Sequence, residues 1–273
     1  MIRGTTRLAA VLGWPVEHSR SPQLLNAAFA ATETDAVLVP LGVPPEGFAA
    51  AIAGLRAVRA LGASVTLPHK LAALSLCDEL TPAARTIGAV NCLQLDGETL
   101  IGHNTDEGGF LDGLVEAGFD LRGKRAVLLG AGGAARAVAY GLRGGRAIEV
   151  VARRPDAVTW AAAWPWTEEH LRDTLARADL VVDCTPIGLG GPDEDAATAQ
   201  IPLEVLRPGA WVATLVYHRT TRLLARAQER GLRILDGRAM LVHQAARAFT
   251  IWTGAPAPVD VMARALEADL AGT

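Results

Sequence analysis

Short apolar runs of strand length alternate with helical patterns along the whole chain, and this alternation constrains the fold more than any other feature of the sequence. The order is typical of α/β proteins, in which helices connect mostly parallel strands. At 273 residues the chain exceeds the usual size of one domain, which is about 100–200 residues. We therefore expect an α/β fold with two domains.

Two series of elements are visible, and a glycine-rich loop after residue 129 opens the main part of the second. The first series predicts strands at 8–12, 36–41, 63–67, 90–95 and 99–102, with helices at 21–31 and 48–59. The second predicts strands at 124–129, 150–152, 180–183, 212–216 and 233–235, a helix at 134–142, and loops at 190–192 and 207–209. Two final helices are expected at 240–252 and 259–270.

Charge and cysteine content narrow the range of partners. The 26 basic and 29 acidic side chains leave a net charge of −3, so the sequence offers no basic footprint for nucleic acid or an anionic membrane surface. No apolar run approaches the roughly 20 residues of a membrane span. Cys77, Cys92 and Cys184 form no CxxC pair or metal-ligand spacing, which favours reduced thiols and no metal site. We expect a cytoplasmic monomer or homodimer that acts on a small molecule.

The loop after the predicted strand 124–129 matches the dinucleotide-binding pattern GxGxxG/A through Gly130, Gly132 and Ala135. Glycine permits a tight turn and close approach of the backbone to a pyrophosphate, and the amino end of the following helix attracts its charge. The alternative is a glycine-rich connector without a ligand. The predicted cofactor-binding loop consists of Gly130, Ala131, Gly132, Gly133 and Ala134.

The residues that follow the next strand predict which dinucleotide is bound. An NAD site usually carries a carboxylate about twenty residues after the glycines, where it binds the ribose hydroxyls. Arg153 and Arg154 stand there instead, and arginine can bind a 2′-phosphate through paired hydrogen bonds. The sequence therefore favours NADP over NAD, although the same pair also fits a solvated strand end.

Polar residues gather at the predicted strand ends of the first series, where ligands bind in α/β sheets. They suit a polyhydroxylated, anionic small molecule, and they are Ser19, Ser21, Thr66, Lys70, Asn91 and Asp106. Each also has a structural interpretation. Ser21 and Asp106 fit helix N-caps, Lys70 fits a solvated helix start, and Asn91 fits a turn.

Six segments resemble the motifs of the shikimate dehydrogenase family, and the resemblance covers essentially the whole length. Residues 13–22, GWPVEHSRSP, together with Asn26, are similar to GxPxxHSxSPxxxN, and residues 65–70, VTLPHK, are similar to VTxPxK. The other matching segments are GAVN at 88–91, GHNTD at 102–106, GAGGAA at 130–135 and MLVHQA at 240–245.

The resemblance implies a role for individual residues. Lys70 and Asp106 are the implied catalytic pair, while Arg153 and Arg154 are implied to hold the 2′-phosphate of NADP, with Gly237 also assigned to the cofactor site. The implied substrate-binding residues are Ser19, Ser21, Thr66, Asn91, Tyr217 and Gln244, in addition to Asp106. The implied domains are a substrate domain at 1–105, a Rossmann-type NADP domain at 106–237, and helices at 238–273 that return to the substrate domain, with the site in the cleft between them.

The implied activity is the reversible reduction of 3-dehydroshikimate to shikimate. Some positions depart from the family pattern. Ser64 replaces the usual asparagine before VT, Ala152 replaces the first residue of NRT, residues 183–189 read DCTPIGL instead of NATPxGM, and no proline follows Tyr217. Ser64 keeps open an enzyme for quinate or an amino analogue of shikimate, and a noncatalytic NADP-binding regulatory protein is a further alternative.

Overall fold

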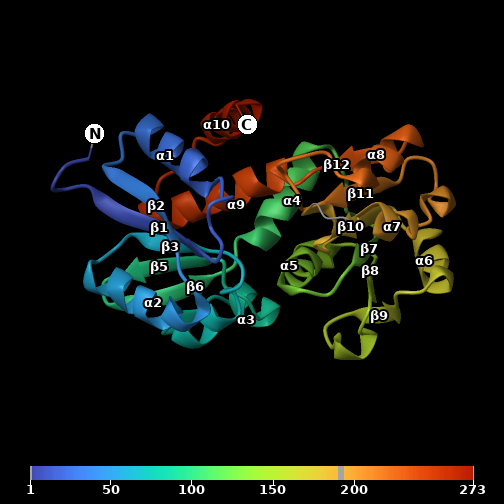
Figure 1. Cartoon of the computed structure of the whole chain (residues 1–273), viewed down its shortest axis with the longest axis horizontal. Coiled ribbons are helices and arrows are strands. Elements are labelled where there is room, and N and C mark those ends of the chain that lie inside the picture. The colour runs from blue at the N-terminus through green and yellow to red at the C-terminus, as the bar shows by residue number, and fades with distance from the viewer. Residues whose placement is uncertain (1, 190–193, 273) are drawn as a thin grey trace. The chain divides into compact units, whose positions relative to one another are not determined.

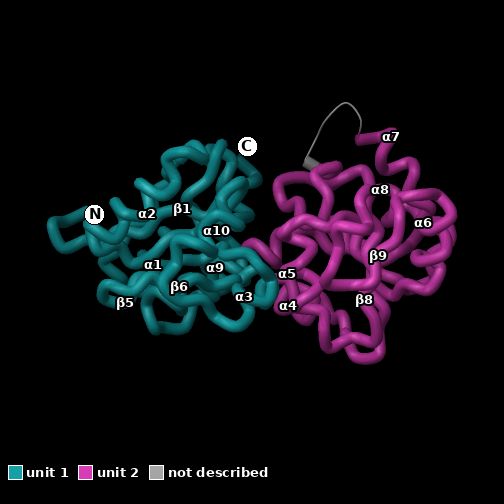
Figure 2. The backbone as a smooth tube through the Cα atoms, turned by 90° about the horizontal axis from the view of Figure 1, so that it is seen from below, with its two compact units in different colours: residues 1–109, 242–273 teal, residues 110–241 magenta. Residues whose placement is uncertain are grey.

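The computed structural model describes residues 2–189 and 194–272, so the predicted loop at 190–192 lies outside the described residues. The chain divides into two compact units (Figure 2). Unit 1 comprises Met1–Gly109 and Val242–Thr273, and unit 2 comprises Phe110–Leu241. The first division therefore falls a few residues after the expected boundary at 105, and the second a few residues after 237.

Unit 1 contains a six-stranded sheet in the order β2-β1-β3-β5-β6-β4 (Figure 1). Its strands are β1 (Arg7–Gly13), β2 (Ala36–Gly42), β3 (Gly62–Val65), β4 (Glu79–Leu80), β5 (Cys92–Asp96) and β6 (Thr99–His103). Its helices are α1 (Ser21–Ala31), α2 (Phe48–Ala57), α3 (Pro82–Ile87) and α10 (Val259–Ala271). α4 (Asp106–Glu116) begins in unit 1, and α9 (Arg238–Thr253) ends there.

One hairpin makes the sheet of unit 1 mixed rather than parallel. β1 runs parallel to β2 and β3, whereas β5 pairs antiparallel with both β3 and β6. The turn that joins β5 to β6 contains Gly97, whose φ is +60°, a backbone conformation that glycine adopts without steric cost. Because of this hairpin, the residues just before β5 lie at the same sheet edge as the residues just after β3 and β6.

Unit 2 contains a fully parallel six-stranded sheet in the order β12-β11-β10-β7-β8-β9. Its strands are β7 (Arg125–Leu129), β8 (Ala147–Ala152), β9 (Ala162–Pro165), β10 (Leu180–Asp183), β11 (Trp211–Thr214) and β12 (Arg233–Leu235). Its further helices are α5 (Gly133–Gly141), α6 (Glu168–Leu175), α7 (Glu194–Ala199) and α8 (Arg222–Glu229). This is the doubly wound order of dinucleotide-binding sheets, and the topology reverses between β7 and β10.

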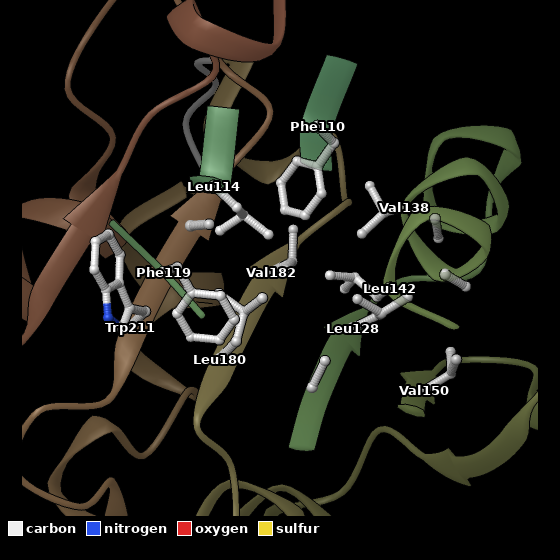
Figure 3. Close-up of a cluster of buried hydrophobic side chains, with 14 of the residues drawn as sticks. Phe110, Leu114, Phe119, Leu128, Val138, Leu142, Val150, Leu180, Val182 and Trp211 are labelled. Atoms are coloured by element: carbon white, nitrogen blue, oxygen red, sulfur yellow. The ribbon is translucent and has the colours of Figure 1, made fainter. Parts of the chain in front are cut away.

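The core of unit 2 follows from alternation along its strands. In β7, Ala126 and Leu128 belong to one buried cluster, while Val127 and Leu129 belong to another. Successive side chains of a strand point to opposite faces of a sheet, so each cluster covers one face. Figure 3 shows the first cluster, in which Phe110 on α4 packs with side chains of the sheet and of α5.

Several boundaries and elements differ from the sequence predictions. The helix predicted to reach residue 59 ends at Ala57, and Arg59 has a φ of +52°, which does not fit a right-handed helix. The strand predicted at 90–95 begins only at Cys92. No prediction covered β4, β9, α3, α6, α7 or α8. α6 and α8 carry a detectable signal, since Thr167 and Thr221 accept N-capping hydrogen bonds at their first turns.

Candidate active site

A buried network of polar side chains occupies the edge of unit 1 where β6 leads into α4. Lys70 Nζ donates to Asp106 Oδ2 over 2.6 Å, and Asn91 Nδ2 donates to Asp106 Oδ1 over 2.8 Å. The side chain of Lys70 is 21% exposed, and that of Asp106 is 9% exposed. Both carboxylate oxygens of Asp106 are therefore engaged, while the ammonium of Lys70 still reaches the surface of unit 1.

The side chains next to Asp106 in sequence hold this network in place. Asn91 Oδ1 accepts from the backbone N–H of Thr105 over 2.7 Å, and Asn91 Nδ2 donates to Thr105 Oγ1 over 3.0 Å. Asn104 Oδ1 accepts from the backbone N–H of Asp106 over 3.2 Å, and Asn104 Nδ2 donates to Ala89 O. Asn104 and Thr105 belong to the motif at 102–106, where the sequence indicates no role for them, and their hydrogen bonds position Asn91 and Asp106.

The loop after β3 that carries Thr66 and Lys70 is anchored at His69. The His69 ring stacks on Phe48 with centroids 4.3 Å apart and planes 4° apart, and Nε2 lies 2.7 Å from Val43 O. The backbone N–H of His69 donates to Thr66 O. His69 is buried, and its contacts support the loop that carries Thr66 and Lys70.

Thr66 and the residues after β1 occupy the same sheet edge, since β1 and β3 are parallel neighbours. A Cβ atom on Gly13 would meet Thr66 Cγ2 at 2.5 Å, so glycine allows the two loops to pack closely. Ser19 lies in the loop after β1, and its Oγ accepts from the backbone N–H of Ser21 over 3.4 Å. The N-cap interpretation of Ser21 is wrong, because Arg20 is the N-cap and Ser21 is already helical.

Gln244 on α9 packs against the helix that carries Asp106. A Cβ atom on Gly109 would lie 2.6 Å from the backbone nitrogen of Gln244, so α9 lies directly beside the start of α4. Asp106 and Gly109 are three residues apart and share a face of that helix. Ser64, the departure from the family pattern, is buried in β3 opposite Cys92.

The glycine-rich loop of unit 2 follows β7, at the reversal of the sheet topology. Gly130 has a φ of +97°, which strongly favours glycine, and its N–H donates to Val151 O. Gly132 is the N-cap of α5, and a Cβ atom on Gly132 or Gly133 would meet nothing within 4 Å. This open space beside a helix amino end fits the close approach of a pyrophosphate.

The other predicted cofactor residues lie in unit 2 at different positions. Arg153 and Arg154 directly follow β8 and are exposed, and within residues 2–189 and 194–272 their guanidinium groups form no ion pair. Gly237 is buried, and a Cβ atom there would meet Leu215 O at 2.2 Å. The close packing against Leu215 therefore requires glycine at this position. Tyr217 lies in the segment after β11 and is half-buried. Its ring lies edge-on to the His218 ring, with the two centroids 5.8 Å apart.

One buried carboxyl at the edge of the unit 2 sheet was not among the predicted site residues. Asp183 ends β10, and its Oδ1 accepts from the backbone N–H and the hydroxyl of Thr185 over 2.9 and 2.6 Å. Burial raises the pKa of Asp183, although the hydrogen bonds from Thr185 act in the opposite direction. In the sequence, this residue is marked by the departure of residues 183–189 from the family pattern.

Burial favours the neutral form of one histidine and of the three cysteines. Burial lowers the pKa of His103, whose Nε2 lies 2.9 Å from Gln94 Oε1. Burial raises the pKa of the Cys77 thiol to about 11, and it also raises the pKa values of Cys92 and Cys184. All three cysteines are free. The described part of the chain contains no cluster of His, Cys, Asp and Glu able to hold a metal ion, and none of its helices is long and apolar enough to span a membrane.

Comparisons with known proteins identify relatives over nearly the full length. A family model described as the shikimate dehydrogenase substrate binding domain matches residues 11–93, and another, described as the shikimate 5'-dehydrogenase C-terminal domain, matches residues 237–267. A shikimate dehydrogenase (NADP(+)) from Moorella thermoacetica is 43% identical, and the alignment covers 97% of this chain and 94% of that protein.

Solved structures agree with these matches. The shikimate 5-dehydrogenase of Thermus thermophilus in complex with NADP(H) and shikimate has a TM-score of 0.85 at 34% identity, covering 96% of this chain and 99% of that one. The shikimate 5-dehydrogenase of Listeria monocytogenes in complex with shikimate and NAD has a TM-score of 0.86 at 33% identity, covering 96% of both chains.

Proposed function

The chain belongs to the shikimate dehydrogenase family, and from that premise we propose that it catalyses the reversible NADP-dependent reduction of 3-dehydroshikimate to shikimate in aromatic amino acid biosynthesis. The observation that carries the proposal is the 2.6 Å contact between Lys70 Nζ and Asp106 Oδ2, with Asn91 bonded to the other carboxylate oxygen. A noncatalytic binding protein has no evident need for a positioned ammonium–carboxylate pair at its ligand edge.

Unit 1 provides the groups that bind the substrate. The hydroxyls of Ser19, Ser21 and Thr66 can exchange hydrogen bonds with the ring hydroxyls and the carboxylate of shikimate. Asn91 adds an amide group beside Asp106, and we assign Gln244 and, from unit 2, Tyr217 to the substrate as well. A site that bonds each hydroxyl discriminates strongly against analogues that lack one, because the partner groups are then left unpaired.

Lys70 acts at the oxygen atom of the reacting carbon. During reduction the Lys70 ammonium donates a proton to the ketone oxygen, and during oxidation the neutral amine accepts the hydroxyl proton. Asp106 holds Nζ in position by its short hydrogen bond. General acid–base catalysis of this kind contributes about 10²–10⁴-fold to the rate.

Unit 2 provides the residues that hold the cofactor. When NADP(H) is bound, it supplies or accepts the hydride. The backbone N–H groups of the loop 130–134 and the amino end of α5 bind the pyrophosphate, because a helix amino end carries partial positive charge. Arg153, with Arg154 beside it, binds the 2′-phosphate through its planar guanidinium. We also assign Gly237 to the cofactor site.

The decisive experiment measures initial rates with shikimate and with quinate, each with NADP⁺ and with NAD⁺. We expect strong turnover with shikimate and NADP⁺ and much weaker turnover in the other three combinations. Arg153→Ser should raise the KM for NADP⁺ by about tenfold or more and leave the KM for NAD⁺ nearly unchanged, since only NADP⁺ carries the 2′-phosphate.

Other outcomes of this comparison would replace the proposal. Equal or better turnover with quinate would indicate that Ser64 has changed the substrate preference, and equal turnover with NAD⁺ would remove the role of the two arginines. No turnover with any cyclohexane or cyclohexene acid, despite NADP binding, would favour the noncatalytic regulatory protein.

Two further properties are part of the proposal. The free thiols of Cys77, Cys92 and Cys184 support a cytoplasmic location, since disulfides are rare in that reducing compartment. We propose a monomer or homodimer, and light scattering of the purified protein measures which of the two is present.

A further inference from the structure

The amino edge of the unit 2 sheet, opposite to the glycine-rich loop, holds a cavity of about 420 Å³ lined mainly by cations. Asp179 is its one acidic lining residue among those that the structure describes. The cationic side chains that line this cavity, the basic cavity below, are Arg122, Lys124, Arg125, Arg146, Arg177 and Arg207.

The basic cavity is distinct from the cofactor site. Lys124 and Arg125 stand at the start of β7, and Gly130 follows its end. A strand rises about 3.3 Å per residue, so the length of β7 separates the two sites by roughly 15 Å. Arg146 precedes β8, Arg177 follows α6, and Arg207 precedes β11, which brings cations from several strand beginnings to one place.

Nearby carboxylates pair with these cations but leave the cavity positively charged. Asp179 pairs with Arg207 at 2.9 Å and with Lys124 at 3.8 Å, and its other oxygen accepts from the backbone N–H of Arg125. The remaining pairs are Arg177 with Glu149 and Asp173, Arg125 with Glu149, and Arg122 with Asp120. Five of the six cations thus pair with four carboxylates and Arg146 pairs with none, which leaves an excess of two positive charges.

Arg146 is the clearest sign of this imbalance. Its side chain is exposed, and no carboxylate of the described chain lies within ion-pair distance of it. The chain as a whole carries a charge of −3, so this positive excess runs against the overall balance. A concave surface lined by one sign of charge concentrates the electric field and attracts counterions.

A second cavity adjoins the basic cavity and adds an apolar wall. This cavity of about 390 Å³ shares Lys124, Asp179 and Arg207 with the basic cavity and is also lined by Trp211. The Arg233 guanidinium lies 5.4 Å from the Trp211 ring centroid. A ligand whose anionic group lies in the basic cavity can therefore extend toward the second cavity, whose lining includes Phe119, Pro208 and the largely buried Trp211.

We propose that the basic cavity is a binding site for a small molecule that carries a doubly charged oxyanion, of which a phosphate group is the model. The excess of two positive charges matches such a group, and guanidinium groups bind phosphate oxygens through short, charge-assisted hydrogen bonds. The site takes a class of ligand separate from the substrate and the cofactor.

The test is isothermal titration of the full-length protein with inorganic pyrophosphate. Saturating NADP⁺ is present to fill the cofactor site, and ionic strength is held constant because salt screens exposed charges. We expect a one-to-one complex with a Kd of about 1 mM or tighter. Arg146→Ser should weaken it by about tenfold, and this variant should fold normally because Arg146 supports no ion pair in the described part of the chain.

Two matched variants separate the basic cavity from general charge effects. Arg230→Ser removes one exposed arginine of unit 2 outside the cavity, and Arg153→Ser removes one from the proposed cofactor site. Both should retain the wild-type Kd for pyrophosphate. Thermal unfolding of each variant confirms that it is folded.

Four results would overturn the proposal. The first is the absence of binding to the wild-type protein at about 10 mM pyrophosphate, far above the expected Kd. The second is an equal loss of affinity in Arg146→Ser and Arg230→Ser, and the third is a loss confined to Arg153→Ser. The fourth is tighter binding of a single-stranded oligonucleotide than of pyrophosphate, which would indicate a nucleic-acid surface instead.

Discussion

The carboxyl edges of the two sheets are built in opposite ways. In unit 1, side chains bond to one another, so that Lys70, Asn91 and Asp106 hold fixed positions. In unit 2, the loop at Gly130–Gly133 presents backbone with open space around Gly132, and Arg153 is exposed without an ion-pair partner in the described residues.

This difference corresponds to two different tasks. A group that transfers a proton must stand in a set position, and a hydrogen-bonded network provides that without reorganisation. A pyrophosphate is bound through several backbone N–H groups, which requires that side chains be absent. Substitutions in the network of Lys70, Asn91 and Asp106 should therefore lower kcat, and substitutions in the loop of unit 2 should mainly raise the KM for the cofactor.

The largest expected effect follows from removal of the ammonium. Lys70→Ala should lower kcat by at least about a hundredfold with a smaller change in the KM for shikimate, because the proton donor and acceptor is lost. Steady-state kinetics in both directions measures this. Arg264→Ala, which removes an exposed cation of α10, is the control and should leave kcat unchanged. Near-normal turnover of Lys70→Ala would contradict the proposed mechanism.

Removal of the brace behind Asp106 should have the next largest effect. Asn91→Ala leaves Asp106 Oδ1 and the N–H of Thr105 without this partner, and should lower kcat by about tenfold to a hundredfold through misplacement of Asp106. The free energy of unfolding should fall by about 1–3 kcal/mol. Urea unfolding and steady-state kinetics give the two values.

A second asparagine of unit 1 provides the control for this prediction. Asn26 bonds through its amide to both backbone groups of Leu38, away from Lys70 and Asp106. Asn26→Ala should lower stability while kcat stays near the wild-type value. If both variants lose kcat equally, the network of Asn91 has only a structural role.

Substitutions in the glycine loop should change the KM for the cofactor more than they change kcat. Gly132→Val fills open space, so it should raise the KM for NADP⁺ by about tenfold or more while kcat and the KM for shikimate change less. The thermal midpoint should change little. Gly130→Val should also reduce stability, because its φ of +97° is strained for a β-branched residue. An unchanged KM for NADP⁺ in Gly132→Val would indicate that the loop does not bind the cofactor.

The smallest expected effect is a pH-dependent change in the free energy of unfolding, caused by the buried carboxyl of Asp183. Burial raises the pKa of Asp183 above its usual value of 3.8, so the folded state binds this proton more tightly, and stability is lost as the pH rises from 3.8 to the native pKa. Asp183→Asn removes this loss and should increase the free energy of unfolding at neutral pH by on the order of 1 kcal/mol.

The pH dependence of that gain is the critical observation. Urea unfolding between about pH 4 and pH 7 should show the difference between Asp183→Asn and wild type growing as the pH rises. Asp96→Asn, at an exposed turn, should show no such trend. A gain that is independent of pH would mean that the amide packs better and that titration of Asp183 is irrelevant.

The residues of the site were predictable to different degrees. The glycine loop stands in a motif whose chemistry follows from residue type and spacing, whereas the catalytic roles of Lys70 and Asp106 are implied by the resemblance to the family. Asn104 and Thr105 stand in the same motif as Asp106, yet their positioning role depends on Asn91, which is more than ten residues distant in sequence. The stacking of His69 on Phe48 could not be predicted from the sequence, because no local pattern connects the two residues.

The sequence by itself determined the α/β class, the glycine loop after a strand, and the kinds of groups available for chemistry. These follow from local periodicity and from backbone requirements at single residues. Only the tertiary structure decided which polar groups meet. Asn91 precedes β5, and it reaches Asp106 after β6 because β5 runs antiparallel to β3 and β6. The pairing direction of strands depends on contacts distant in the chain, which an apolar pattern does not encode.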